Sequence, residues 1–145
     1  MIVNSREIQM KNITKHIVAI LLAAFLVMMG VQKFGAENII FATIAERSGM
    51  AFFEPQIRML TGVLELIAAI LLFIPKVRSF GALLAFCLIG GAIVFHLSPW
   101  LGIMISMAPG APATPMLFLM AVGSFVLSCI VLYQNRQSIP FIGAK

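Results

Sequence analysis

Charged residues are scarce in this chain. Only 10% of its 145 residues are charged and five are acidic, whereas 61% are hydrophobic and the mean hydropathy is +1.08. A soluble domain of this size needs charged side chains over its surface, so this composition excludes one and requires lipid to cover the molecule. The net charge of +5 is typical of residues that orient a membrane protein. We therefore expect the lipid bilayer as a partner and no nucleic acid.

Cysteine and histidine are also rare, with two residues of each type. Cys87 and Cys129 do not form a CxxC pair, and no cysteine–histidine pair has the spacing of zinc ligands. We predict two buried structural thiols and no metal site. His16 and His96 are expected at opposite faces of the membrane, which excludes a haem-ligand pair.

Long apolar runs occupy most of the chain. A helix that crosses a bilayer needs about 20 mostly apolar residues, and four segments meet this requirement, at roughly 16–34, 56–74, 79–97 and 114–133. With their loops they account for nearly the whole sequence. We therefore predict an all-α polytopic membrane protein, a four-transmembrane-helix bundle, with residues 1–145 as a single membrane domain.

The connections between these spans differ in character. Residues 35–56 form the longest one, and helical spacing places Ile40, Phe41 and Ile44 on one side of it. This pattern predicts a short amphipathic helix at the membrane interface between the first two spans, with Gly49 as its C-cap. Residues 98–114 are so rich in proline and glycine that neither a regular helix nor a strand is expected.

The distribution of lysine and arginine predicts the orientation. Seven of the ten lie at the N-terminus, in the loop between the second and third spans, or at the C-terminus. These three parts share one side of the membrane. The other side carries only Lys33, Arg47 and Arg58. The positive-inside rule then places both termini in the cytoplasm.

One carboxylate lies near the middle of a span. An ionisable side chain at this depth costs roughly 2.5–3.5 kcal/mol on insertion scales, so Glu65 is expected to be turned inward and either paired or protonated. Arg58 and Gly62 share its helix face, because the spacing is i, i+4, i+7. Lys33 and His96 end other spans on the same side of the membrane. We predict an inward cluster of the four ionisable residues, open to the outer face.

Each member of this cluster also has a simpler interpretation. Lys33 and Arg58 lie at helix ends, from which their side chains can snorkel to lipid headgroups. His96 can be a solvated or hydrogen-bonded helix end. Glu65 can serve only to tie two helices together, although a role in ligand binding or proton handling is the stronger expectation for an acid at this depth.

Four glycines within or at the ends of the spans are expected to act as packing notches. Gly30, Gly62, Gly90 and Gly91 each remove a side chain and so allow a neighbouring helix to approach closely. Gly62 lies one turn from Glu65, where the missing side chain leaves room for a helix or a ligand.

Two short motifs resemble elements of the DoxX-like membrane proteins. The second helix of that family carries a G-x-x-E element, and its first span ends in G-x-x-K-[LF]. The matching parts of this sequence are the run TGVLEL at 61–66, the stop Ile74-Pro75, the end of the first span Gly30-x-x-Lys33-Phe34, and Ile139-Pro140 in the basic tail. The resemblance covers roughly residues 16–142.

The resemblance implies a four-helix membrane bundle of mostly bacterial origin. The family's naming member is similar to a subunit of a thiosulfate:quinone oxidoreductase, and other relatives are linked to redox homeostasis or to the assembly of membrane proteins. The glycine, lysine and glutamate of the family's motifs fall on Gly30, Lys33, Gly62 and Glu65. A thiol-redox mechanism is not supported for this sequence, because no catalytic cysteine pattern is present.

From these observations we expect a protein of the bacterial inner membrane that binds a ligand or a quinone as part of a redox system. A polar cavity would surround Glu65, with Lys33, Arg58 and His96 at its mouth. No complete catalytic motif is present, and a quinone is the only cofactor suggested. A redox partner subunit and a homo-oligomer are the expected protein partners. The alternatives are a non-enzymatic assembly or structural protein, and a transporter of protons or small solutes.

Overall fold

The computed structural model describes residues 5–108 and 110–138, and the chain is helical over most of this length. Four helices are long and apolar enough to cross a membrane, as the hydropathy predicted. The elements in chain order are α1 (Ser5–Gln32), α2 (Ile39–Ser48), η1 (Ala51–Phe53), α3 (Gln56–Phe73), α4 (Arg78–Leu97), α5 (Met116–Gln134) and η2 (Arg136–Ser138). The all-α fold with four spans is thus confirmed.

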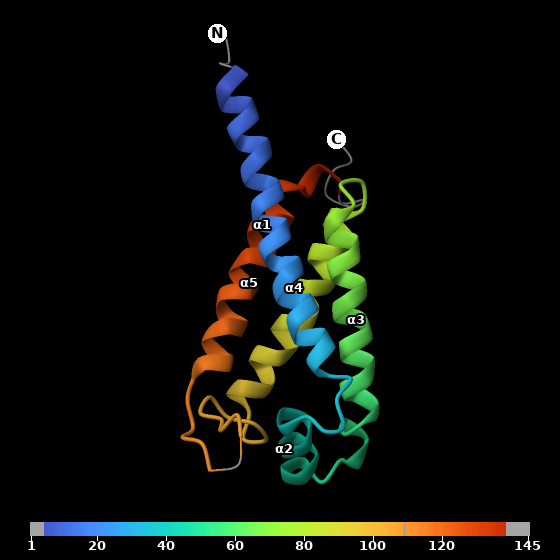
Figure 1. Ribbon diagram of the computed structural model, residues 1–145, viewed down its shortest axis with the longest axis vertical. Coiled ribbons are helices and arrows are strands. Elements are labelled where there is room, and N and C mark those ends of the chain that lie inside the picture. Colours follow the sequence, from blue (N-terminus) through green and yellow to red (C-terminus); the bar gives the residue numbers. More distant parts are fainter. Residues whose placement is uncertain (1–4, 109, 139–145) are drawn as a thin grey trace.

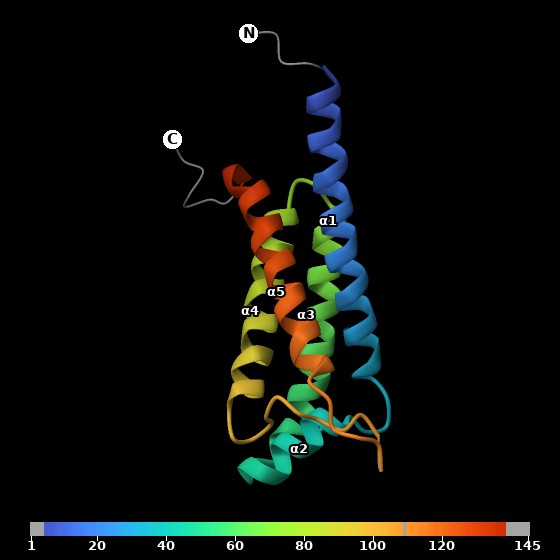
Figure 2. The ribbon, with the colours of Figure 1, turned by 90° about the vertical axis from the view of Figure 1, so that its left-hand side faces the viewer.

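The four long helices form a bundle in which α1 packs against α3 and α5, and α4 packs against the same two helices. Figures 1 and 2 show the N-terminal part of α1 extending beyond the rest of the bundle. The sequence placed the start of the first span near residue 16, but the helix already begins at Ser5. Its polar first turns continue the same helix, because no proline or glycine interrupts them. The C-terminal residues Ile139, Pro140 and Lys145 lie outside the described residues.

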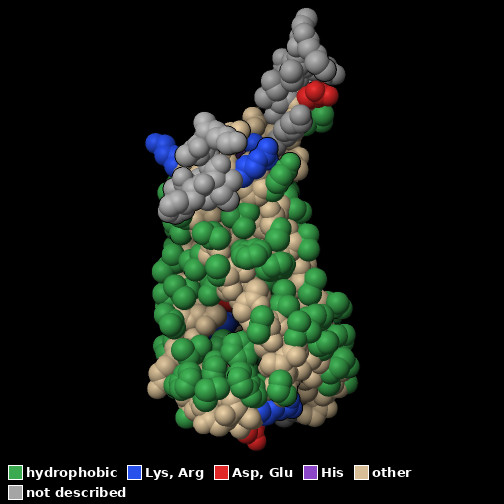
Figure 3. Space-filling model, turned by 180° about the vertical axis from the view of Figure 1, so that it is seen from behind, with side chains coloured by type: hydrophobic (Ala, Val, Ile, Leu, Met, Phe, Trp, Pro, Cys, Tyr) green, Lys and Arg blue, Asp and Glu red, His purple; other side chains and the backbone are tan. Residues whose placement is uncertain are grey.

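Small side chains make up much of the interior of the bundle, together with a few leucines, and many large apolar side chains face outward. The core includes six alanines that are almost completely buried: Ala19, Ala23, Ala68, Ala69, Ala82 and Ala85. Apolar side chains such as Ile70 and Val94 are more than half exposed, and green apolar atoms cover the sides of the molecule in Figure 3. This distribution is expected where lipid rather than water surrounds the helices, because small interior residues let the backbones approach closely.

The prediction that both cysteines are buried is wrong. Cys87 on α4 and Cys129 on α5 are free and exposed on the outside of their helices. Their apolar sequence neighbours suggested an interior position. In a membrane bundle, however, apolar residues surround positions that face lipid as well as positions in the core.

Among the described glycines, the one with the least room for a side chain is Gly81, which the sequence did not single out. A Cβ on Gly81 would lie 2.8 Å from both the Leu71 Cβ and the Leu72 nitrogen, so α4 and α3 nearly touch at that level. Away from this crossing the two helices diverge (Figure 1). A Cβ on Gly90 would make only an ordinary contact, 3.4 Å from the Phe125 ring, and a Cβ on Gly91 would meet nothing within 4 Å. The prediction of a packing notch is therefore wrong for Gly91.

The predicted short amphipathic helix is α2. Asn38 caps its start by accepting a hydrogen bond from the Ile40 N–H, and Gly49 ends it with a φ of 72°. Figures 1 and 2 show α2 lying across one end of the bundle. Its buried residue Ile44 belongs to an apolar cluster that also contains residues of η1, of the α4–α5 loop and of α5: Phe53, Leu101, Ile105 and Leu117. The apolar side of α2 therefore covers the protein interior at this end.

At the opposite end, Arg78 does more than add positive charge to a loop. It is the first residue of α4 and is only 5% exposed. Its Nε donates to the Leu72 carbonyl over 2.8 Å, and its Nη2 lies 3.2 Å from the His16 Nδ1. Arg78 thus satisfies a carbonyl in the last turn of α3, where helical partners are missing. Burial of this residue could not be read from its position in a short basic loop.

Candidate functional site

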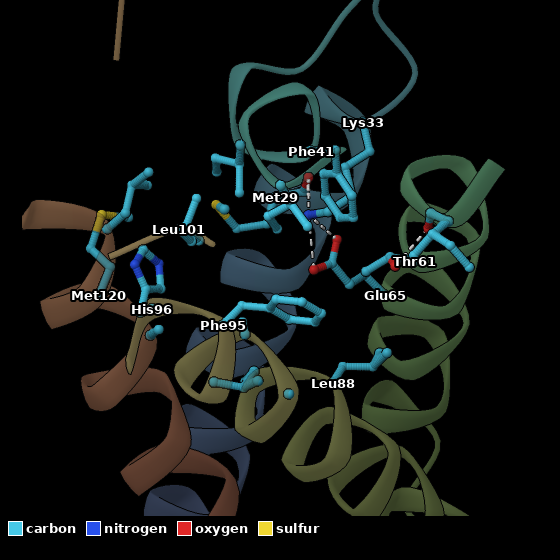
Figure 4. A pocket seen from close by; sticks show the side chains of 18 of the residues that line it. Met29, Lys33, Phe41, Thr61, Glu65, Leu88, Phe95, His96, Leu101 and Met120 are labelled. Atoms are coloured by element: carbon cyan, nitrogen blue, oxygen red, sulfur yellow. Dashed lines mark hydrogen bonds and ion pairs between the residues drawn. The ribbon is translucent and has the colours of Figure 1, made fainter. Parts of the chain in front are cut away.

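The mid-span carboxylate is paired with a lysine. Lys33 follows the last residue of α1, and its Nζ lies 2.7 Å from Oε2 and 3.0 Å from Oε1 of Glu65 in α3. The same ammonium donates to the Met29 carbonyl over 3.1 Å. Lys33 is 5% exposed and Glu65 is 8% exposed. Lys33 therefore does not snorkel outward but turns back into the bundle, as Figure 4 shows.

Glycines on both helices make this pairing possible. A Cβ on Gly30 of α1 would lie 3.2 Å from the Gly62 carbonyl oxygen of α3 and 3.1 Å from the Leu66 side chain. No larger residue fits at this crossing without a shift of its neighbours. The missing side chains of Gly30 and Gly62 let α1 and α3 approach closely, so that the side chains of Lys33 and Glu65 can form an ion pair.

Arg58 does not join this pair. It is 3% exposed, and its Nη1 donates to the carbonyl oxygens of Lys33 and Gly35 over 2.6 and 2.7 Å. Its Nε lies 2.7 Å from Oε1 of Glu54, an ion pair in which the N–H bond is not directed at the oxygen. The prediction that Arg58 joins a cluster around Glu65 at the mouth of the cavity is therefore wrong. Its guanidinium instead anchors the connection between α1 and α2, and with it the backbone of Lys33.

His96 lies in the last turn of α4 and is 5% exposed. Its Nδ1 is 2.9 Å from the Gly102 carbonyl oxygen, and its ring meets Phe118 edge to face at 5.8 Å. A carbonyl oxygen can only accept, so Nδ1 carries the hydrogen in this contact. The hydrogen bond and the aromatic contact together fix the orientation of the imidazole.

The ion pair and His96 line one cavity of about 260 Å³. Figure 4 places Lys33 and Glu65 on one side of it and His96 on another. The remaining walls are mainly apolar, with residues from α2 and all four long helices, among them Phe25, Ile40, Phe41, Ile57, Leu88, Phe95, Leu117 and Met120. The sequence predicted a polar cavity around Glu65. The structure shows instead an apolar cavity into which a few polar side chains project.

The cavity opens at the side of the bundle. The exposed residues of its lining include Cys87, Gly91 and Ala92 on α4, in the half of the bundle where α4 has diverged from α3 (Figure 1). Figure 3 shows a hollow in the apolar side of the molecule with acidic and basic side chains at its bottom. The end of the bundle is covered by α2, which Arg47 holds to the α4–α5 loop through a 3.1 Å hydrogen bond to the Leu101 carbonyl. The prediction that the cavity opens toward the outer face is therefore wrong.

Sequence reasoning missed several residues of the lining. Phe41 was assigned to the apolar side of α2 but not to a cavity, and Phe95 and Leu101 carried no signal at all. Phe41 lies near the ion pair, with its ring centroid 6.0 Å from the Lys33 Nζ. Such neighbours come from segments far apart in the chain, so their positions depend on how the helices cross.

These features define an integral membrane protein built as a four-helix bundle with a buried ion pair beside a cavity. The model of the DoxX-like family matches residues 17–124, and the chain belongs to this family. The matched region includes all four of the predicted ionisable residues. No curated protein and no solved structure matches the chain.

Proposed function

We propose that this protein holds a quinone, or a similar small hydrophobic ligand, in the cavity between its helices as a component of a membrane redox system. One observation carries the proposal: an apolar cavity in the membrane-spanning part contains a buried ion pair and a hydrogen-bonded histidine. Pockets for small molecules typically combine apolar walls with a few placed polar groups. Ionisable residues within membrane spans mark functional sites more often than other residues do.

The residues present fit a quinone. A flat ring can lie among Phe41, Phe95 and Leu88, and an apolar tail can leave through the gap between α3 and α4 into the surrounding lipid. When bound, a quinone supplies two-electron, two-proton chemistry. The chain itself contributes walls that exclude water and two basic groups, the Glu65 carboxylate and the His96 imidazole. In this proposal a partner subunit exchanges the electrons.

The direct test is to identify what copurifies with the protein. The chain is purified in nanodiscs formed from its native membrane, extracted with organic solvent, and analysed by mass spectrometry for quinones. We expect a quinone in the wild type, less in Glu65→Gln, and an unchanged amount in Glu37→Gln, which alters an exposed glutamate. Absence of a bound quinone, together with unaltered affinity of Glu65→Gln for an added decyl-tailed quinone, would overturn the proposal.

A structural role is the second candidate, and one observation favours it. Lys33 uses all three of its ammonium hydrogens within the protein, two on Glu65 and one on Met29. An ion pair of this kind can hold α1 against α3 without any ligand. A substitution of Gly91 distinguishes the two functions, because this residue lines the cavity but does not touch the ion pair. A larger side chain there should affect ligand binding but not a purely structural role of the pair.

We further propose that the protein lies in a bacterial inner membrane with both termini in the cytoplasm, as the lysine and arginine distribution predicts. The end of the bundle covered by α2 would then face outward. In a variant with both cysteines replaced by alanine, a single cysteine at Lys15 or Glu37 tests this orientation. Labelling of intact cells with a membrane-impermeant maleimide is expected at position 37 only, and the reverse pattern would refute it.

A further inference from the structure

We infer that the cavity recognises a head group that donates hydrogen bonds, and therefore binds a quinol more tightly than the corresponding quinone. This inference rests on the proposed function and specifies its ligand. It follows from the hydrogen bonds of the polar side chains that line the cavity. The strong donors among these side chains already donate within the protein, so the groups that remain free for a ligand are hydrogen-bond acceptors.

Lys33 illustrates this most clearly. An ammonium group has three hydrogens and no acceptor. The three contacts of the Lys33 Nζ are the two Glu65 oxygens, at 2.7 and 3.0 Å, and the Met29 carbonyl, at 3.1 Å. A ligand oxygen that only accepts would have to displace one of these bonds.

Thr61 and His96 show the same pattern. The Thr61 hydroxyl donates to the Ile57 carbonyl, one turn earlier in α3, over 2.8 Å, and keeps its lone pairs. The His96 Nδ1 hydrogen is used on the Gly102 carbonyl. In a neutral imidazole the other nitrogen, Nε2, is then an acceptor, and the structure gives it no partner among the described residues.

Glu65 adds the strongest acceptor. Each carboxylate oxygen has two lone pairs, and the structure gives each of them one hydrogen bond, from Lys33. Apart from Lys33, Thr61 and His96, the one side chain of the described lining with a polar hydrogen is Cys87, and its thiol is a weak donor. Glu65, Thr61 and His96 therefore present acceptors in surroundings that are otherwise apolar.

A quinone and its quinol differ in the hydrogen bonds that their oxygens can form. The carbonyl oxygens of a quinone only accept, so in this cavity they would lie unpaired or against other acceptors. The hydroxyl groups of a quinol can donate to Glu65 and to the Thr61 hydroxyl or the His96 Nε2. Burying a polar group without a partner is costly in an apolar site, and a site built for one hydrogen-bonding pattern rejects an analogue that lacks it.

Two further hydrogen bonds of ordinary strength correspond to roughly a tenfold difference in affinity. Tighter binding of the reduced form also raises the potential of the bound couple above that of the free couple. For two electrons, a tenfold preference shifts the midpoint potential by about 30 mV.

The test compares three probes that share one ring and one decyl tail: the quinone, the quinol, and the dimethyl ether of the quinol. The ether keeps the ring of the quinol but has no hydrogen to donate. Each is titrated anaerobically into the full-length protein in nanodiscs, with the quinol kept reduced by ascorbate, and binding is followed by the increase in thermal stability. We expect the quinol to bind roughly tenfold more tightly than either of the others.

A matched pair of threonine variants locates the effect. Thr61→Val removes an acceptor from the cavity, whereas Thr43→Val removes a hydroxyl with the same type of bond, to the Ile39 carbonyl over 2.7 Å, from a residue outside the cavity lining. Both changes are nearly isosteric and leave the ion pair intact. We expect a roughly threefold loss of the preference for quinol in Thr61→Val only.

The outcomes are distinguishable. Equal binding of all three probes, or tighter binding of the quinone, would refute the inference while leaving the ligand-binding function in place. If Thr43→Val lowers the preference as much as Thr61→Val does, the preference does not arise in this cavity and the inference is wrong. Failure of every probe to bind would remove the proposed function and, with it, the inference.

Discussion

Gly62 lies directly against Lys33: a Cβ on this glycine would be 3.0 Å from the Lys33 Cβ and 3.1 Å from the Gly30 carbonyl oxygen. The residue that allows α1 and α3 to meet is thus also the residue against which the lysine rests. Glu65 lies one turn after Gly62. The same helix crossing therefore brings the backbones together and pairs the charges of Lys33 and Glu65.

Replacement of Gly62 by alanine is expected to lower stability. The added methyl group must displace Lys33 or the backbone of α1, and overpacking of this kind typically costs about 1–3 kcal/mol. Thermal unfolding in a single detergent measures the change. Gly123→Ala on α5 is the matched control, because a Cβ there meets nothing within 4 Å and alanine favours a helix over glycine by about 1 kcal/mol. Equal stability of the two variants would show that the notch is not tight.

The ion pair can be tested by a double-mutant cycle. Lys33→Met leaves the Glu65 carboxylate buried without its partner, and loss of one member of a buried pair costs about 3–5 kcal/mol. Glu65→Gln is expected to be less damaging, because a neutral amide can still accept from the ammonium. The double variant should regain most of the stability lost in Lys33→Met. Additive losses in reversible unfolding would contradict a direct interaction between the two side chains.

Gly91 allows the cavity to be filled without disturbing the ion pair. Gly91→Leu places a side chain where nothing lies within 4 Å, and the position lines the cavity. We expect loss of binding of a decyl-tailed quinol with no loss of thermal stability. Gly123→Leu makes the same change at an equally open helical position outside the lining and should bind normally. Normal binding by Gly91→Leu would show that the ligand does not occupy this cavity.

Arg58→Lys is expected to loosen the connection between α1 and α2. Lysine cannot reproduce the guanidinium geometry that reaches the carbonyl oxygens of Lys33 and Gly35 and the Glu54 carboxylate together. Hydrogen exchange followed by mass spectrometry should show faster exchange in residues 33–38. Arg136→Lys is the control, because Arg136 is exposed and begins η2, the short helix that follows α5 at the other end of the bundle. Unchanged exchange in Arg58→Lys would mean that the connection is held by other contacts.

Most of the architecture could be predicted from the sequence. A segment that crosses a bilayer must be apolar along its length and must satisfy its backbone hydrogen bonds internally. Four such segments were therefore visible as local patterns, with boundaries that agree with the helices to within a few residues except at the start of α1. The face shared by Arg58, Gly62 and Glu65 was also predictable, and all three are buried on α3.

The candidate site was only partly predictable. Lys33 and Arg58 were equivalent partners for Glu65 by charge and depth, but only Lys33 reaches it. Gly91 was predicted to be a packing notch and Gly81 was not, yet a Cβ on Gly81 would collide with α3 whereas a Cβ on Gly91 would meet nothing within 4 Å.

The sequence by itself determined that the chain crosses a membrane four times, and which side chain in the second span must avoid lipid. Both depend on properties that repeat along one helix. Only the tertiary structure decided which cation neutralises Glu65, that α2 turns its apolar side inward, and that the cavity opens between α3 and α4. These three features depend on how the helices rotate and cross. Contacts between residues that are distant in the chain determine that arrangement.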